Sequence, residues 1–264
     1  MPAKRDYSTA IAEYKAGKSL SQLEKEQHLC RHTLAARLKA QGIPIRSPAS
    51  YRASSINHHA FDKVTEESAY WVGFLMADGC IYEHSETNLT PRVSLHLARK
   101  DRDTIERFRE FLSSEHRIRT NTISFDSGDL SYDKLDFGSQ HIVDRLAYFG
   151  VVPHKTKRAK VLHLENSRHF WRGVIDGDGC LTWSAKFPSF QLVGSQPLMQ
   201  QFCDYIAEHL NIHTVPRKYK GKNVWTVSLY CRKASKMARH FYTNQAVSLE
   251  RKLARAKLFI TFYD

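Results

Sequence analysis

The chain has 264 residues, a length typical of two domains with a small additional unit. Hydrophobic residues make up 42% of the sequence, and no apolar run reaches the ~18–20 residues that span a bilayer, which excludes a disordered, collagen-like or membrane-spanning chain. The 40 Lys and Arg residues exceed the 27 Asp and Glu residues by 13, and this charge favours nucleic acid as a partner over the alternative of a merely basic soluble enzyme.

The N-terminal segment MPAKRDYSTA is positively charged but has no apolar stretch behind it, so it does not predict a signal peptide. The five cysteines form no CxxC pair, which argues against a zinc knuckle or a disulfide framework. We therefore expect a protein that is not secreted: a cytoplasmic, nucleoid-associated protein, or one encoded by an organelle or a phage.

Residues 1–46 predict a small all-α unit of three helices. The first helix ends near Gly17, Ser19 can cap the second, Leu29 lies in a turn, and the third stops before Gly42. The apolar residues that mark the three helices are, in chain order, Ile11 and Tyr14, Leu20 and Leu23, and Leu34 and Leu38. The short connection between the second and third helices predicts a helix-turn-helix.

This segment resembles the DNA-binding helix-turn-helix of resolvases and invertases, although its turn reads His28-Leu29-Cys30 where that family usually has Gly and a small polar residue. The resemblance implies that the third helix enters the major groove. Residues 1–50 hold 9 Lys and Arg against 4 Asp and Glu, which favours DNA binding over a purely structural three-helix cap. The side chains expected to face DNA are Arg31, His32, Thr33 and Arg37.

Residues 47–64, with little periodicity and several serines, predict a linker. Beyond them the sequence repeats itself, because AYWVGFLMADGCI at 69–81 and HFWRGVIDGDGCL at 169–181 align without a gap at an offset of 100. The two segments share Trp71/Trp171, Gly73/Gly173, Asp78/Asp178, Gly79/Gly179 and Cys80/Cys180. We therefore expect two similar subdomains, at residues 65–160 and 161–264.

Each subdomain combines alternating strands with amphipathic helices. The segments RVSLHL (92–97) and VWTVSLY (224–230) alternate apolar and polar residues, as half-buried strands do. The helices are marked by Ile105, Phe108 and Leu112 in the first half and by Met199, Phe202, Ile206 and Leu210 in the second. The prediction is an α+β fold of two pseudo-symmetric αββαββα subdomains with antiparallel sheets.

Each repeated motif predicts a helix that ends at Asp-Gly. The first helix covers 66–77, with Thr65 as its cap, two glutamates in its first turn, and Gly79 ending it in the left-handed conformation. Small residues four apart in both helices allow the two backbones to approach closely: Gly73 and Ala77 in the first, Gly173 and Gly177 in the second.

Such packing would bring Asp78 and Asp178 together. Each carboxylate would then lie at the negative end of a helix dipole and next to a like charge. Both effects favour a compensating cation, and hard divalent ions with oxygen ligands fit best. An ordinary helix-ending turn would explain one Asp-Gly, but not two in one repeated frame.

The paired motifs resemble those of the LAGLIDADG homing endonucleases in their single-chain, two-motif form, over residues 60–264. The resemblance implies saddle-shaped sheets and a divalent metal site formed by Asp78 and Asp178, with the backbone carbonyls of Ala77 and Gly177 as further ligands. It implies two or three Mg²⁺ ions, for which Mn²⁺ can substitute. Asp176, which the family does not use as a ligand, is assigned to the helix interface.

Two lysines resemble the active-site lysine segments of that family. Lys155 follows Asp78 by 77 residues, and Lys252 follows Asp178 by 74. Positive charge near a scissile phosphate stabilises the transition state. The alternative is a solvated basic face, since other Lys and Arg residues surround both positions.

The polar faces of the strands are expected to lie along the major groove of DNA, where Arg and Gln can read base edges. The candidates are Arg92, Ser94, His96, Arg117, Arg119, Gln191, Arg217, Lys218, Thr226 and Ser228. Trp183 belongs either to the core or to this face, and burial is the more usual place for an indole.

The sequence thus predicts a metal-dependent, sequence-specific double-strand DNA endonuclease. Its partner would be duplex DNA with a long asymmetric target, and it would act as a monomer without an obligate protein partner or a membrane. The resemblance implies 5′-phosphate ends and short 3′ overhangs. Two alternatives stay open: a DNA-binding transcriptional regulator of the same fold that does not cleave, and an intron RNA-splicing maturase.

Overall fold

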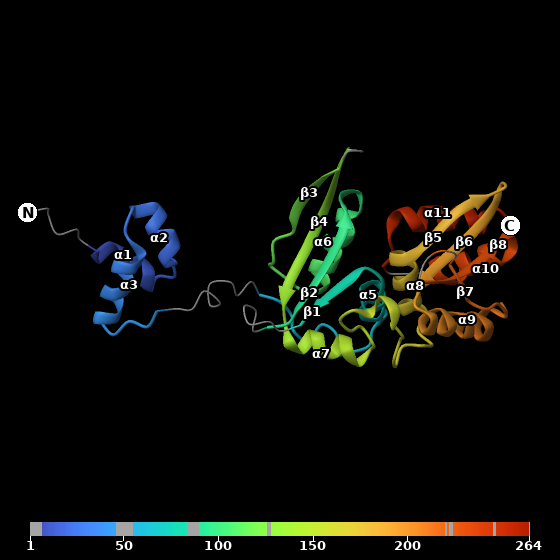
Figure 1. Cartoon of the computed structure of the whole chain (residues 1–264), viewed down its shortest axis with the longest axis horizontal. Coiled ribbons are helices and arrows are strands. Elements are labelled where there is room, and N and C mark those ends of the chain that lie inside the picture. The colour runs from blue at the N-terminus through green and yellow to red at the C-terminus, as the bar shows by residue number, and fades with distance from the viewer. Residues whose placement is uncertain are drawn as a thin grey trace, which may run out of the picture. The chain divides into compact units, whose positions relative to one another are not determined.

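The computed structural model describes residues 7–45, 55–83, 90–125, 128–219, 221, 224–244 and 247–263. The chain forms two compact units, Met1–Ser54 and Ser55–Asp264 (Figure 1). Residues 47–54 of the expected linker lie outside the described residues. Residues 55–64 of that linker belong to the larger unit, in which the side chain of Phe61 is buried and the Asn57 amide donates to the Leu112 carbonyl at 2.8 Å.

The smaller unit contains helices α1 (Ser8–Lys15), α2 (Leu20–Gln27) and α3 (Arg31–Ala40). Ser19 begins α2 with a capping box: its hydroxyl accepts from the Gln22 amide, and the Gln22 side chain accepts from the Ser19 amide at 2.8 Å. The core consists of Tyr7, Ala10, Ile11, Tyr14, Leu23, Leu29, Leu34 and Leu38. His28 takes the left-handed conformation, φ 51°, and so serves in the turn where a glycine is more usual.

The larger unit repeats one order of elements. Its first half contains α5 (Glu66–Asp78), β1 (Gly79–Tyr82), β2 (Arg92–Ala98), the short helix η1 (Arg99–Asp101), α6 (Arg102–Phe111), β3 (Arg119–Phe125), β4 (Gly128–Gly138) and α7 (Gln140–Tyr148). After η2 (Lys155–Lys157), its second half contains α8 (Arg168–Asp178), β5 (Gly179–Ser184), β6 (Phe187–Gly194), α9 (Gln196–Leu210), β7 (Arg217–Lys218), β8 (Trp225–Tyr230), α10 (Cys231–Tyr242) and α11 (Glu250–Thr261).

Each half forms one four-stranded antiparallel sheet, and the two sheets have the same topology. The strand orders are β1-β2-β4-β3 and β5-β6-β8-β7. Equivalent residues begin the first pairing in each sheet, with Gly79 opposite Leu95 and Gly179 opposite Leu192. This confirms the predicted α+β fold of two αββαββα halves. No helix in the described part of the chain has the length and apolarity needed to cross a membrane.

The repeated tryptophans occupy equivalent places in the core. Trp71 and Trp171 are fully buried in α5 and α8. Trp71 packs on Phe108 of α6, with ring centroids 4.9 Å apart, and Trp171 packs on Phe202 of α9, at 5.3 Å. Each motif helix therefore packs, through its tryptophan, against the helix that follows the second strand of its own half. This shared role in the core explains why the tryptophan recurs in both motifs.

Helices α5 and α8 pack against each other at the centre of the larger unit (Figure 1). A Cβ atom added to Gly73 would lie 2.0 Å from the Phe170 carbonyl oxygen, and one added to Gly173 would lie 2.0 Å from the Tyr70 carbonyl oxygen. Only glycine permits this approach, so the predicted backbone-to-backbone packing is confirmed.

The expected left-handed conformation of Gly79 is wrong. Gly79 is extended, with φ −73° and ψ 147°, and Gly179 is extended in the same way. Both residues leave the helix directly into a strand, and a Cβ atom on Gly79 would lie 2.6 Å from the Leu75 carbonyl oxygen. Glycine is needed here for close approach to the preceding helical turn, and not for a positive φ angle.

Candidate active site and nucleic-acid interface

Asp78 and Asp178 are the last residues of α5 and α8, where these two helices approach each other. Gly177 makes the approach possible, because a Cβ atom there would lie 2.3 Å from the Ala77 side chain and 3.1 Å from Asp78 Oδ2. The carboxylate of Asp78 therefore lies over the last turn of α8. The helix pair brings together Asp78 and Asp178, the two acids that the repeated motifs indicate.

The environment of both acids opposes their ionisation. Burial raises the pKa of Asp78, while the nearby Lys252 and Lys155 oppose that rise. Burial and then the charge of Asp78 raise the pKa of Asp178 to about 6, again opposed by Lys155 and Lys252. The two carboxyl groups thus lie close enough for the charge of Asp78 to disfavour the ionised form of Asp178.

Lys155 lies in η2, which follows the first half of the larger unit. Its ammonium group donates a hydrogen bond to the Gly79 carbonyl oxygen, at the point where α5 passes into β1. Burial lowers the pKa of Lys155, and the charges of Asp178 and Asp78 act in the opposite direction. The structure therefore places this predicted lysine beside both acids.

Lys252, in the first turn of α11, is only 5% exposed. Its Nζ donates to the carbonyl oxygens of Ile175, Asp176 and Gly177 at 2.8, 2.6 and 3.1 Å. Burial lowers the pKa of Lys252 to about 8. The side chain thus caps the C-terminal end of α8, where a positive charge is favourable.

These bonds affect one expected ligand. The Gly177 carbonyl, which the family resemblance assigns to metal binding, accepts a hydrogen bond from Lys252. A carbonyl oxygen has two lone pairs, so this bond leaves one for a further partner. The sequence pattern indicated Lys252 as a positive charge near the acids. It did not indicate that the ammonium group donates to three backbone carbonyls.

Asp176 is fully buried at the interface between α5 and α8, as expected. Tyr70 and Tyr242 donate their hydroxyl hydrogens to its carboxylate at 2.9 and 2.6 Å, and the Leu249 amide donates at 2.7 Å. The bond from Tyr70 crosses from one motif helix to the other, and the bond from Leu249 attaches the segment before α11. Asp176 therefore fixes the helices whose ends carry Asp78 and Asp178.

A salt bridge that sequence reasoning missed joins the two halves near the acids. The Arg251 guanidinium of α11 contacts both carboxylate oxygens of Asp101 in η1, with Nε at 2.9 Å from Oδ1 and Nη2 at 3.1 Å from Oδ2. Arg251 and Asp101 both influence the pKa of Asp78. Their separation of 150 positions in the sequence leaves no local signal from which the pairing could have been predicted.

The strand face of the first half carries mixed charge. Arg92 forms an ion pair with Asp136 on the neighbouring strand β4, and Lys134 lies 3.4 Å from the same carboxylate. Ser94 is fully buried, and its hydroxyl contacts His96 Nε2 at 2.7 Å. Arg117 and Arg119 are exposed. Of these five candidates, Ser94 is not accessible to a ligand in this structure.

The strand face of the second half carries mostly neutral polar groups. Gln191 of β6 and Ser228 of β8 face each other, with Gln191 Nε2 at 3.5 Å from Ser228 Oγ. Thr226 is paired with the exposed Arg217 of β7, whereas the neighbouring Lys218 alternates to the other side of the sheet. Trp183 packs edge-on against Phe259 at 5.3 Å, so it belongs to the core side, as preferred.

All four candidate DNA contacts of the smaller unit are exposed on α3: Arg31, His32, Thr33 and Arg37. The first three form its first turn. The Arg37 guanidinium also lies 4.3 Å from the centre of the Tyr7 ring, a cation–π contact that orients it.

No protein-family model matches the chain, and no curated protein matches it. The solved structures that are similar to it in fold include two meganucleases. The LAGLIDADG meganuclease I-AabMI bound to uncleaved DNA has a TM-score of 0.51 and 12% sequence identity, over 75% of this chain and 90% of that chain. The meganuclease I-SmaMI bound to uncleavable DNA has a TM-score of 0.50 and 12% identity, over 76% of this chain and 92% of that chain. The chain shares the fold of these meganucleases.

Proposed function

We propose that the chain is a sequence-specific double-strand DNA endonuclease. The observation that carries this proposal is the pair Asp78 and Asp178, which are brought together at the ends of two glycine-packed helices, where the charge of Asp78 adds to the rise in the pKa of Asp178. A protein that needed only stability would not place two carboxyl groups there, because each raises the cost of the other's charge. A site that binds cations gains from that arrangement.

The residues present fit divalent metal ions. Carboxylate and carbonyl oxygens are the donors that Mg²⁺ prefers, and Asp78, Asp178 and the carbonyls of Ala77 and Gly177 would supply them. We propose two or three Mg²⁺ ions, with Mn²⁺ able to substitute. Such ions activate water as a nucleophile and neutralise charge that develops on the phosphate.

The two lysines would have different roles in this reaction. Lys155, which is less deeply buried, would stabilise the negative charge that develops on the attacked phosphate. Lys252 has its donors occupied by the end of α8, so it would act by favouring the ionised forms of Asp78 and Asp178. Water would add to phosphorus and the 3′ oxygen would leave, which gives 5′-phosphate ends.

The proposed partner is duplex DNA. A net charge of +13 favours phosphate contacts, and the exposed side chains of the strand faces and of α3 can reach base edges in the major groove. The two halves carry different residues on their strand faces, so we propose a long asymmetric target. One chain supplies both acids, and a second copy is therefore not needed.

A cleavage assay on a randomised duplex library tests the proposal. The full-length protein is incubated with the library in Mg²⁺, and the cut ends are sequenced. Recurrent ends that disappear with a chelator, and with Asp78→Asn, support the endonuclease. Selective binding without cut ends would support a regulator of the same fold, and splicing of an intron RNA would support a maturase.

A further inference from the structure

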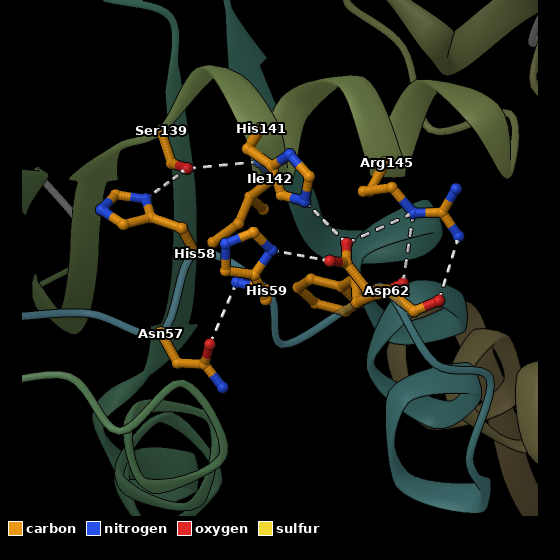
Figure 2. Close-up of polar contacts among 9 residues, drawn as sticks. Asn57, His58, His59, Asp62, Ser139, His141, Ile142 and Arg145 are labelled. Carbon is orange, nitrogen blue, oxygen red and sulfur yellow. Dashed lines mark hydrogen bonds and ion pairs between the residues drawn. The ribbon is translucent and has the colours of Figure 1, made fainter.

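Three side chains outside the proposed active site converge on the surface of the larger unit. His59 and Asp62 come from the segment before α5, and His141 comes from the first turn of α7 (Figure 2). Asp62 Oδ2 lies 2.7 Å from His59 Nδ1, and Asp62 Oδ1 lies 2.7 Å from His141 Nε2. The function proposed above uses none of the three.

The backbone on both sides of this cluster is fixed by buried neighbours. Phe61, between His59 and Asp62, is 1% exposed and packs on Phe111, and Ile142, next to His141, is fully buried. The His59 amide donates to Asn57 Oδ1 at 3.0 Å, and the Asp62 amide donates to the His59 carbonyl at 3.1 Å. The segment therefore forms a tight turn that directs His59 and Asp62 towards α7.

The three donor atoms have the chemistry and spacing of a metal site. The two imidazole nitrogens and the carboxylate oxygen all lie within 4.8 Å of one another, and among the described residues no other group of three His, Cys, Asp or Glu does so. Zinc at ~2.0–2.1 Å from tetrahedral ligands would separate the ligand atoms by about 3.3 Å. Rotation of these exposed side chains can open the 2.7 Å contacts to that separation.

We propose that His59, Asp62 and His141 bind Zn²⁺, with water in the fourth position. Two imidazoles and one carboxylate favour zinc over magnesium or calcium, which prefer all-oxygen ligands. Upon binding, zinc would replace the protons now shared between the imidazoles and the carboxylate. The site is therefore distinct in its ion from the one proposed at Asp78 and Asp178.

Arg145 limits how tightly this site binds. Its Nε lies 3.7 Å from Asp62 Oδ1 and donates to the Phe61 carbonyl at 3.4 Å, and its guanidinium lies 4.7 Å from the centre of the Tyr148 ring. These contacts hold a positive charge next to the cluster. Together with the exposure of all three ligands, this charge predicts affinity in the micromolar range rather than the nanomolar range.

Zinc binding would hold two segments of the larger unit together. The turn at 57–62 begins two residues after Ser55, the first described residue beyond the segment 46–54, and α5 begins four residues beyond Asp62. A zinc ion would tie this turn to α7, and so fix the start of the larger unit ahead of α5.

Zinc binding to the full-length protein tests the proposal. The protein is stripped with a chelator, and Zn²⁺ uptake is measured by equilibrium dialysis in excess Mg²⁺, which occupies oxygen-only sites. His141→Gln and Asp62→Asn remove one ligand each and preserve hydrogen-bonding capacity. His58→Ala is the matched control, because His58 adjoins the cluster but contacts Ser139 instead (Figure 2).

We expect the wild type and His58→Ala to bind one equivalent of zinc. Both ligand variants should lose this binding. At free zinc of 100 times the dissociation constant, the wild-type unfolding temperature should rise by roughly 5–10 °C. X-ray absorption of the wild-type zinc complex gives a readout that needs no variant: nitrogen and oxygen neighbours at ~2.0–2.1 Å support the site. Sulfur neighbours at ~2.3 Å, equal uptake by all variants, or no saturable uptake below about 100 µM would overturn the proposal.

Discussion

Lys252 and Gly177 are joined by a hydrogen bond of 3.1 Å, from the ammonium nitrogen of α11 to a carbonyl oxygen in the last turn of α8. The same nitrogen contacts the carbonyls of Ile175 and Asp176. One positive charge therefore completes the end of the helix that carries Asp178 and also lies close enough to both acids to favour their ionisation.

We predict that Lys252→Met destabilises the protein by about 2–4 kcal/mol, because it leaves carbonyl groups at the buried end of α8 without donors. The free energy of unfolding is measured by denaturant titration. Lys257→Met, at an exposed position of the same helix, is the matched control and should change it by less than about 0.5 kcal/mol. Equal stabilities for the two variants would contradict a capping role for Lys252.

Asp78→Asn and Asp178→Asn should each abolish double-strand cleavage in Mg²⁺ and leave DNA binding largely intact. The amide preserves the size of the side chain and removes the charge that would hold the metal, whereas the proposed binding would depend on phosphate contacts spread over the surface. Cleavage and gel-shift assays on one target duplex measure the two effects. Asp204→Asn, an exposed position in α9, is the control, and cleavage at the wild-type rate by either active-site variant would refute the assignment.

The stability of the metal-free protein should depend on pH through Asp178. Its folded-state pKa of about 6 lies above the unfolded value of 3.8, so protonation of Asp178 stabilises the folded state. This stabilisation is complete below pH 3.8 and is lost as the pH rises through 6. Asp178→Asn should therefore match the wild type near pH 4 and exceed it by up to about 3 kcal/mol above pH 6. Unfolding titrations in a chelator across this range measure the difference, and a constant difference would contradict the raised pKa.

Lys155→Ala should slow cleavage more than it weakens binding. The loss of one phosphate contact changes the salt slope of binding by about 0.9, whereas the loss of a transition-state charge lowers the rate by roughly 10²–10³. Rates at saturating protein and salt-dependent affinities separate the two effects. If rate and affinity fall by the same factor, Lys155 is an ordinary backbone contact.

Removal of residues 1–50 should leave a folded larger unit that binds DNA more weakly and over a shorter site. The smaller unit has its own core, so the larger unit does not need it to fold. Its proposed DNA contacts would add to those of the larger unit, because the two units are tethered. Footprints of the full-length and truncated proteins on one duplex measure the effect, and identical footprints would assign the smaller unit to a different partner.

The sequence was sufficient to predict the fold because each level of pattern agreed with the next. Alternation in RVSLHL predicts a strand with Val93 and Leu95 inside, and both residues are buried in β2. The repeated Gly73 and Gly173 predict close helix packing, and the packing determines where the two acids lie. These features depend on local periodicity or on a repeat, and both can be read along the chain.

The features that the sequence did not predict depend on register and on distant contacts. Ser94 belongs to the polar face by alternation, but it is fully buried and contacts His96. Arg92 meets Asp136 only because of the pairing of β2 with β4. The bonds of Lys252 to the end of α8 depend on how α11 docks. The left-handed conformation expected for Gly79 failed because a strand follows the helix without any turn between them.

The glycine-lined contact of α5 with α8 restricts how the two halves could be exchanged by recombination. A first half can join a second half from another protein of this fold only when both motif helices lack side chains at the positions of Gly73 and Gly173, since each backbone occupies the place of the other's Cβ. The strand faces lie outside this contact and carry no such restriction. Whole halves can therefore be exchanged only when each half brings its own glycine to the contact.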